Sequence, residues 1–192
     1  MADLSGSFGT SQEGGLRLIT ENATISPQTV DETGKSVASS IDGVEVFYPV
    51  THEDERGSLC EIYNQAWGFD DIPMVHAYAV TVRRGKVKGW ACHSNQVDRY
   101  FFFAGTAKLV LFDARADSPT SGMVTEQTFS PIRRALVSAP PGVFHAVGNV
   151  GDDEVVLFNL PSEPYNYETP DKVTLPIESP DIPYRFDNLT GH

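Results

Sequence analysis

The sequence predicts an all-β protein built as an antiparallel sandwich or barrel, and two observations support this prediction. Short stretches rich in Val, Ile, Phe and Tyr recur at roughly ten-residue intervals from residue 44 onward, and Gly, Pro, Asp or Ser bounds each of them. No stretch shows a sustained helical period of useful length. The 192 residues suffice for one domain with a sizeable core.

Composition narrows the classes of partner and compartment. The formal net charge is −12, so the chain would repel the phosphate backbone of a nucleic acid. Two cysteines are too few for disulfide bonds to stabilise a chain of this length, and the N-terminal residues lack the apolar core of a signal peptide. No apolar run is long enough to span a membrane. We therefore expect a cytoplasmic protein without nucleic-acid or membrane partners.

The chain is expected to comprise an arm, a barrel and a strap. Residues 1–43 are rich in Ser, Gly, Thr and acidic residues and predict an extended N-terminal arm. Residues 44–192 are expected to form one barrel domain, with a loop at residues 51–57. Residues 162–186 hold many of the 13 prolines and predict a C-terminal strap, because proline removes donors from a strand ladder. Besides the segment described next, strands are expected at residues 44–50, 58–63, 75–85, 107–115, 124–129, 133–139, 144–150 and 154–161.

Two segments hold the residues that we expect to line a cavity. The first, Gly85–Gly105, contains His93 and Asp98. The second, Pro140–Asn149, places His145 shortly after a Pro-Pro-Gly turn, where a short rigid connection fixes its direction. The two histidines and the aspartate are the expected chemical content of this cavity.

Strand alternation sets the directions expected for the side chains around His93. Successive side chains of a strand point to opposite faces. His93 should therefore share the inward face with Ala91 and Val87. Lys88 and Trp90 should point to the other face.

The same two segments resemble the paired motifs of cupins, G-x5-H-x-H-x3-4-E-x6-G and P-x-G-x2-H-x3-N. In the first motif His93 and Asp98 stand at ligand positions, whereas Ala91 replaces the other histidine. In the second motif every fixed position between Pro140 and Asn149 is matched. The resemblance implies an antiparallel cupin-type jelly-roll barrel.

Residues 44–186 more narrowly resemble the dTDP-4-dehydrorhamnose 3,5-epimerase family. This resemblance implies a barrel that binds a nucleotide-linked keto-sugar, in a homodimer that exchanges strands. It also implies that Arg56 and Glu61 contact the nucleotide. The motifs that carry it are DERGSLCE (Asp54 to Glu61), KGW after Gly85, Gln96, FDARADSPTSG (Phe112 to Gly122), PPGVFHAV and PYNY.

Several positions depart from the pattern of that family. Ala91 replaces the proton-abstracting histidine, Asp98 replaces the active-site lysine, and Phe158 aligns with the tyrosine expected as general acid. A methyl group cannot act as a base, so the standard 3,5-epimerisation is not expected. The glutamine and asparagine that contact the nucleotide align with His76 and Tyr78.

Two chemistries remain open for the cavity. Without a metal, His93 or His145 carries the proton, because histidine has an ordinary pKa of about 6.5, and Tyr165 or Tyr100 is the partner acid. Asp98 then orients one imidazole. With a metal, the two histidines and Asp98 form a facial triad for one divalent ion such as Fe, Zn, Ni or Mn. We expect no cofactor, with the metal ion as the alternative.

Three functions follow from these observations. The first is an epimerase or isomerase that acts on a nucleotide-activated keto-sugar or a related small molecule. The second is a metal-dependent cupin enzyme, and the third is a non-catalytic small-molecule-binding protein, because a fold does not fix a function. The candidate catalytic residues are His93, His145, Asp98 and Tyr165. The candidate substrate-binding residues are Arg56, Glu61, His76, Tyr78, Lys88, Gln96 and Tyr100.

Overall fold

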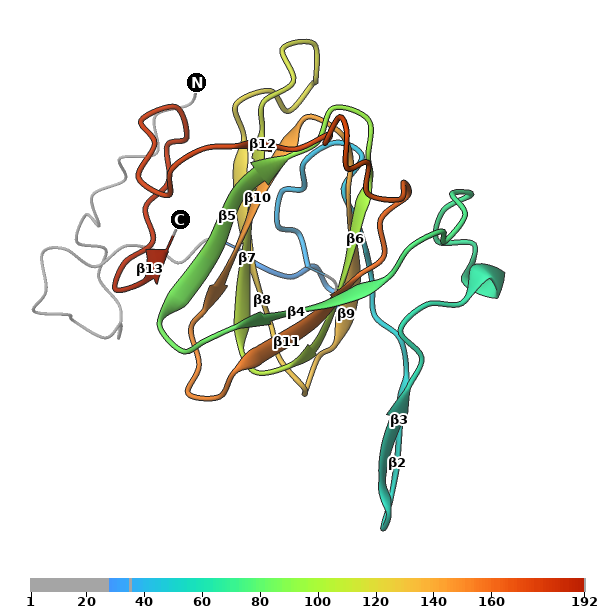
Figure 1. Cartoon of the computed structure of the whole chain (residues 1–192). Coiled ribbons are helices and arrows are strands. Elements are labelled where there is room, and N and C mark those ends of the chain that lie inside the picture. Colours follow the sequence, from blue (N-terminus) through green and yellow to red (C-terminus); the bar gives the residue numbers. More distant parts are fainter. Residues whose placement is uncertain (1–27, 35, 192) are drawn as a thin grey trace, which may run out of the picture. The chain divides into compact units, whose positions relative to one another are not determined.

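The computed structural model of the chain describes residues 28–34 and 36–191. The chain divides into two units, with the boundary between Ala38 and Ser39. In the first unit, Val30 pairs with Ser36 in an isolated antiparallel bridge. The second unit consists mainly of two β-sheets that face each other (Figure 1). Residues 1–27 of the predicted arm lie outside the described residues.

The two sheets confirm the predicted all-β architecture. Among the described strands all pairs are antiparallel except β13 with β5. The five-stranded sheet has the order β1 (Glu45–Phe47), β9 (Ala135–Ala139), β6 (Asp98–Ala104), β11 (Val155–Asn159) and β4 (Tyr78–Val82). The other sheet has the order β12 (Val173–Thr174), β5 (Lys86–Cys92), β10 (Val143–Asn149), β7 (Ala107–Asp113) and β8 (Val124–Phe129), with β13 (Thr190–Gly191) beside β5.

Alternate residues of each strand fill the space between the sheets. Along β6, Tyr100 and Phe102 point into this interior, whereas Phe101 between them packs on the outer face. Along β7, Leu109 and Leu111 point inward in the same way. Because every second side chain of a strand points inward, polar residues at the inward positions of neighbouring strands can meet in one cavity.

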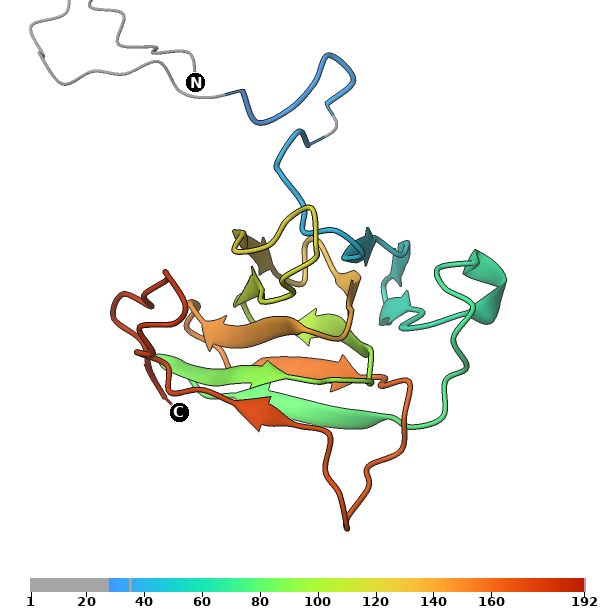
Figure 2. The same cartoon turned by 90° about the horizontal axis from the view of Figure 1, so that it is seen from above.

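The C-terminal strap covers the outer face of the sheet that contains β5. Ile177 and Ile182 pack there against Trp90 and Val110. The strap also adds β12 to the edge of β5, and Figure 2 shows these two strands side by side. Burial of apolar surface contributes roughly 25 cal/mol per Å². The strap is therefore an integral part of the folded domain.

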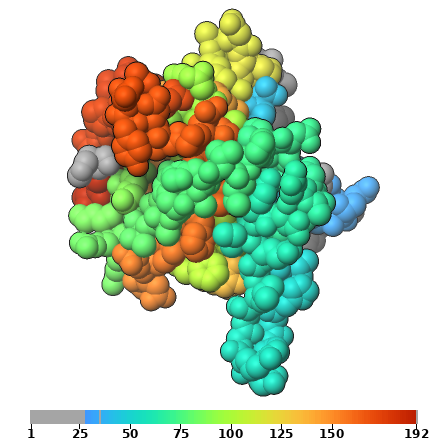
Figure 3. Space-filling model, turned by 45° about the vertical axis from the view of Figure 1, so that its right-hand side comes forward, coloured from blue at the N-terminus to red at the C-terminus, as the bar shows by residue number. Residues whose placement is uncertain are grey.

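The segment at residues 51–57, predicted as a loop, forms most of a hairpin, so this prediction was wrong. β2 (Thr51–Asp54) pairs with β3 (Gly57–Cys60). The hairpin extends away from the barrel (Figures 1 and 3), and all four residues of β2 are exposed. A strand without a buried face carries no alternating apolar pattern, which explains why the sequence conceals it.

One short helical turn, η1 (Gln65–Trp67), is the only helix among the described residues. The side chain of Asn64 caps it by accepting a hydrogen bond from the backbone N–H of Ala66, and Gly68 ends it in the left-handed conformation. Within the described part of the chain, no helix has the length and apolarity needed to cross a membrane.

Strand β5 contains one extra residue relative to its neighbour β10. Ala91 stands opposite His145, but Lys88 stands opposite Val147, so three steps along β5 match two along β10. As a result Val87 packs in the outer cluster and Lys88 lines the cavity. The directions predicted for these two side chains were wrong, because a period of two does not carry across a bulge.

Replacing Gly89 by Ala should destabilise the protein, because β10 lies against this position of the bulge. An added Cβ would lie 2.6 Å from the Cβ of Ala146 and 2.7 Å from the carbonyl oxygen of His145, at a φ of +132°. Overpacking and backbone strain together should lower the free energy of unfolding by about 2 to 4 kcal/mol. Gly122→Ala is the control, since its φ is +78° and no atom lies within 4 Å of the added Cβ. Equal losses of stability in urea denaturation would contradict this account.

Candidate active site

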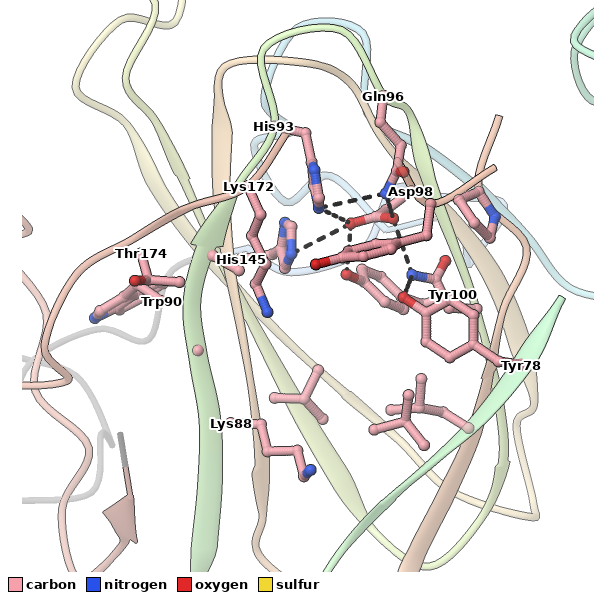
Figure 4. A pocket seen from close by; sticks show the side chains of 18 of the residues that line it. Tyr78, Lys88, Trp90, His93, Gln96, Asp98, Tyr100, His145, Lys172 and Thr174 are labelled. Carbon is pink, nitrogen blue, oxygen red and sulfur yellow. Dashed lines mark hydrogen bonds and ion pairs between the residues drawn. The ribbon is translucent and has the colours of Figure 1, made fainter. Parts of the chain in front are cut away.

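A cavity of about 900 Å³ lies between the two sheets, and the strap forms part of its wall (Figure 4). Its lining side chains come from β4, β5, β6, β10 and β11, and from the segment between Pro161 and Pro176. The structure brings His93, Asp98 and His145 together in this cavity.

Asp98 is the centre of the polar network in the cavity, although its side chain is only 2% exposed. Its Oδ2 atom accepts a hydrogen bond from the hydroxyl of Tyr100 at 2.7 Å. Its Oδ1 atom accepts hydrogen bonds from Nε2 of Gln96 at 2.7 Å and from Nδ2 of Asn159 at 2.9 Å. A buried carboxylate requires such donors, because the loss of hydration is costly.

The two histidines share one oxygen atom of Asp98. The Nε2 atoms of His93 and His145 each lie 3.3 Å from Oδ2, and the two rings stack with their centroids 5.9 Å apart. Burial alone would raise the pKa of Asp98, but the hydrogen bond with His93, the positive charges that the two imidazoles can carry, and the amide of Asn159 hold it well below its usual range. Asp98 is therefore ionised at neutral pH.

The shared carboxylate shifts the two imidazoles in opposite directions. Burial favours the neutral form of His93, but its interactions with Asp98 and with the backbone carbonyl of Asp171 outweigh burial and raise its pKa. Burial lowers the pKa of His145, and the nearby charges of His93 and Lys172 act in the same direction, against Asp98. Neutral His145 thus coexists with a more readily protonated His93.

Asp171, a residue that sequence reasoning missed, fastens the strap to the site. Its carboxylate accepts hydrogen bonds from the backbone N–H groups of Ser94, Asn95 and Gln96 at 2.9, 2.8 and 3.0 Å. Its backbone carbonyl contacts Nδ1 of His93. The ring of His93 is therefore held on one side by the strap and on the other by Asp98. Nothing in the local pattern around Asp171 distinguishes it from other acidic residues of the proline-rich tail.

Asn159 is the second residue that sequence reasoning missed. Its amide donates to Asp98 and also to the hydroxyl oxygen of Tyr78 at 2.8 Å. Burial and the charge of Asp98 raise the pKa of Tyr78, and they raise the pKa of Tyr100 much further. A polar residue at an inward position of β11, two after Leu157, was the signal that could have found Asn159.

The remaining cavity residues among those predicted are Gln96, His76, Lys88 and Tyr165. His76 packs its ring near Tyr78, with the centroids 5.4 Å apart. The side chain of Tyr165 comes from the segment that follows β11 and remains about half exposed. These residues place aromatic and cationic groups around a cavity of the size expected for a small-molecule site.

Arg56 and Glu61 do not join this cavity within the chain. Arg56 lies at the tip of the β2–β3 hairpin and pairs with Asp54 of the same hairpin. Glu61 follows the hairpin and accepts a hydrogen bond from Asn64. Their predicted contact with a nucleotide would therefore need a site outside the described cavity of their own chain.

Two positions predicted to differ from the family pattern also have clear places in the fold. Ala91 lines the cavity and stands directly opposite His145 on the neighbouring strand. Phe158 packs in the cluster on the outer face of its sheet, while Leu157 and Asn159 on either side line the cavity. A tyrosine at position 158 would face away from the cavity.

The donor set at the centre of the cavity also fits a divalent metal ion. One ligand atom each from His93, Asp98 and His145 lie within 4.8 Å of one another. Two imidazoles and one carboxylate form the facial triad that holds divalent Fe and similar ions, with open positions for a substrate. The hydrogen bond from Tyr100 to the Oδ2 atom of Asp98 would compete with such a ligand.

Curated relatives of this chain take part in polysaccharide or glycan synthesis. The probable low-salt glycan biosynthesis epimerase Agl13 of Haloferax volcanii is 29% identical over 140 residues, which cover 72% of this chain and 90% of that protein. The spore coat polysaccharide biosynthesis protein SpsL of Bacillus subtilis is 27% identical over 150 residues, which cover 77% of this chain and 97% of that protein.

Solved structures show the same fold. The 3'-monoepimerase ChmJ of Streptomyces bikiniensis, in complex with dTDP-quinovose, has a TM-score of 0.69 and 25% identity over 79% of each chain. A dTDP sugar isomerase of Desulfovibrio desulfuricans also has a TM-score of 0.69, at 24% identity over 75% of this chain and 90% of that one. The cupin-type jelly roll predicted from the sequence is thereby confirmed. The profile of dTDP-4-dehydrorhamnose 3,5-epimerases matches residues 38–189, and the chain therefore belongs to this family.

Proposed function

We propose that this protein is an epimerase of a dTDP-linked keto-sugar in which His145 is the proton-abstracting base. The observation that carries the proposal is that two imidazoles lie 3.3 Å from one carboxylate oxygen in the cavity. Their pKa values are shifted in opposite directions, as is typical of the acid and base of a site. Ala91, at the place of the family's base, stands opposite His145 in the ladder. The base is thus displaced across one pair of strands and remains in the same cavity.

The proposed reaction exchanges one proton on a carbon next to a carbonyl group. Neutral His145 takes this proton, and the electron pair of the C–H bond moves to form an enolate. Ionised Asp98, 3.3 Å from Nε2 of His145, stabilises the imidazolium that results. Protonation of the same carbon from its other face then gives the epimer.

Tyr165 is the proposed partner acid on that other face. It lines the cavity from the segment after β11 and remains about half exposed. Tyr100, the other candidate, is less suited because its proton is held by Asp98 at 2.7 Å. His76, Tyr78, Lys88 and Gln96 line the cavity and are the proposed contacts with the substrate.

His145→Gln should lower kcat by about 10²- to 10⁴-fold, because the glutamine amide cannot accept the proton. Binding of dTDP should remain, since the base acts on the sugar. Incorporation of deuterium from D₂O into dTDP-4-keto-L-rhamnose and related dTDP-keto-sugars, followed by mass spectrometry, measures the exchange directly. Unchanged exchange in the variant would remove His145 from the mechanism. A wild-type protein that binds dTDP but exchanges no proton would instead favour the non-catalytic binding function.

A metal-dependent cupin enzyme is the second candidate, because His93, Asp98 and His145 offer three convergent ligand atoms. For the proposed epimerase, dialysis against EDTA should leave turnover unchanged, since proton transfer between imidazole and carbon needs no ion. Metal content by mass spectrometry and activity after dialysis test this. One ion per chain together with loss of turnover that added metal restores would favour the second candidate.

The β2–β3 hairpin supports a homodimer in which Arg56 contacts the nucleotide bound by a second copy. An isolated two-stranded hairpin is marginally stable in water, and this one leaves Leu59 62% exposed. Light scattering should give twice the chain mass of 21.0 kDa. Arg56→Ala should weaken dTDP binding by roughly 10- to 100-fold through loss of a charge-assisted hydrogen bond. Arg84→Ala, another exposed arginine paired with an aspartate, is the control, and equal effects would contradict this role.

A further inference from the structure

Lys172 occupies a fixed position on the strap, between two anchors. On one side, the carboxylate of Asp171 accepts three backbone N–H groups of residues 94–96. On the other side, Val173 pairs with Cys92 at the edge of β5. The backbone of Lys172 is therefore held against the barrel, directly before β12.

The side chain of Lys172 points into the cavity, as does that of Lys88 (Figure 4). Neither lysine forms an ion pair or a hydrogen bond with any residue of the described part of the chain, so both ammonium groups are available to a ligand. The charge of Lys172 is close enough to His145 to favour the neutral imidazole. Lys88 stands opposite Val147, beyond the bulge, and is not among the main charges acting on His145.

Removal of a proton next to a carbonyl group leaves negative charge on the carbonyl oxygen. This charge requires a positive group that is already in place near the base, because stabilisation of developing charge is commonly the largest single contribution to catalysis. Within the central cluster, Asp98 is anionic and would repel the enolate, and His93 is already paired with Asp98 at 3.3 Å. Lys172 extends from the strap into the same cavity as the base, and it has no ion-pair partner among the described residues.

Building on the proposed function, we infer that Lys172 is a catalytic residue whose ammonium group binds the carbonyl oxygen of the keto-sugar and stabilises the enolate. The proton leaves carbon for His145, the C–H electron pair forms the carbon–carbon double bond, and the carbonyl π electrons move to the oxygen beside Lys172. Return of a proton to carbon reverses these shifts, so Lys172 keeps its own protons throughout. The strap thereby supplies chemistry to the site as well as a wall.

The test compares Lys172→Met with Lys172→Arg and with the control Lys108→Met. Lys108 pairs with Glu126 on the outer side of the barrel, so its replacement makes the same change of net charge away from the cavity. Lys172→Met should lower kcat by about 10²- to 10³-fold, which is the usual effect of removing one group that stabilises an oxyanion. The Kd for dTDP should change less than about threefold. Lys172→Arg keeps the charge and should recover at least about tenfold of the lost kcat.

The outcomes separate the inference from the function on which it rests. If the wild-type protein is active and Lys172→Met keeps more than half of its kcat, the role of Lys172 is overturned but the proposed function is not. Two results would overturn charge stabilisation of the enolate. One is that Lys172→Met and Lys172→Arg lose kcat equally. The other is that Lys172→Met binds dTDP much more weakly. Wild-type protein without exchange on any dTDP-keto-sugar would overturn the proposed function itself, and this inference with it.

Discussion

The burial of one carboxylate, Asp98, constrains the whole interior of this barrel. A charge removed from water must be compensated by hydrogen bonds and opposite charge, and removing one partner leaves a costly imbalance. Three strands and a loop provide the compensation: Tyr100 from β6 itself, Asn159 from β11, His145 from β10, and Gln96 with His93 from the turn before β6. The positions of these side chains are therefore linked through one pair of oxygen atoms.

This constraint explains why the pKa values of two chemically identical side chains are shifted in opposite directions. Both imidazoles approach the same oxygen of Asp98 at 3.3 Å. His93 also meets the carbonyl of Asp171, which favours its charged form, whereas His145 is more deeply buried. One carboxylate balances one imidazolium well, and a second positive charge at the same place is disfavoured. The two rings therefore differ in their affinity for a proton, as an acid and a base require.

The fold and the centre of the site were predictable from the sequence, because both depend on local patterns. Turn residues and strand spacing indicated the barrel, and the two motif segments predicted that His93, Asp98 and His145 share one cavity. The directions of Val87 and Lys88 were not predictable, since the extra residue in β5 depends on its pairing with β10. The contacts of Asp171 and the position of Lys172 in the cavity were missed, because both depend on where the proline-rich tail returns to the barrel. The cytoplasmic location and the boundary of the N-terminal arm at residue 43 remain predictions.

The place of Asp171 in the chain has a consequence for the order in which the site forms. During synthesis every barrel strand from β1 to β11 leaves the ribosome before residue 171 does, and domains tend to fold from the N-terminal side as they emerge. A nascent chain can therefore close its sheets while the loop at residues 94–96 still lacks its anchor and His93 its carbonyl contact. The catalytic centre is therefore completed later in synthesis than the strands β1 to β11 that surround it.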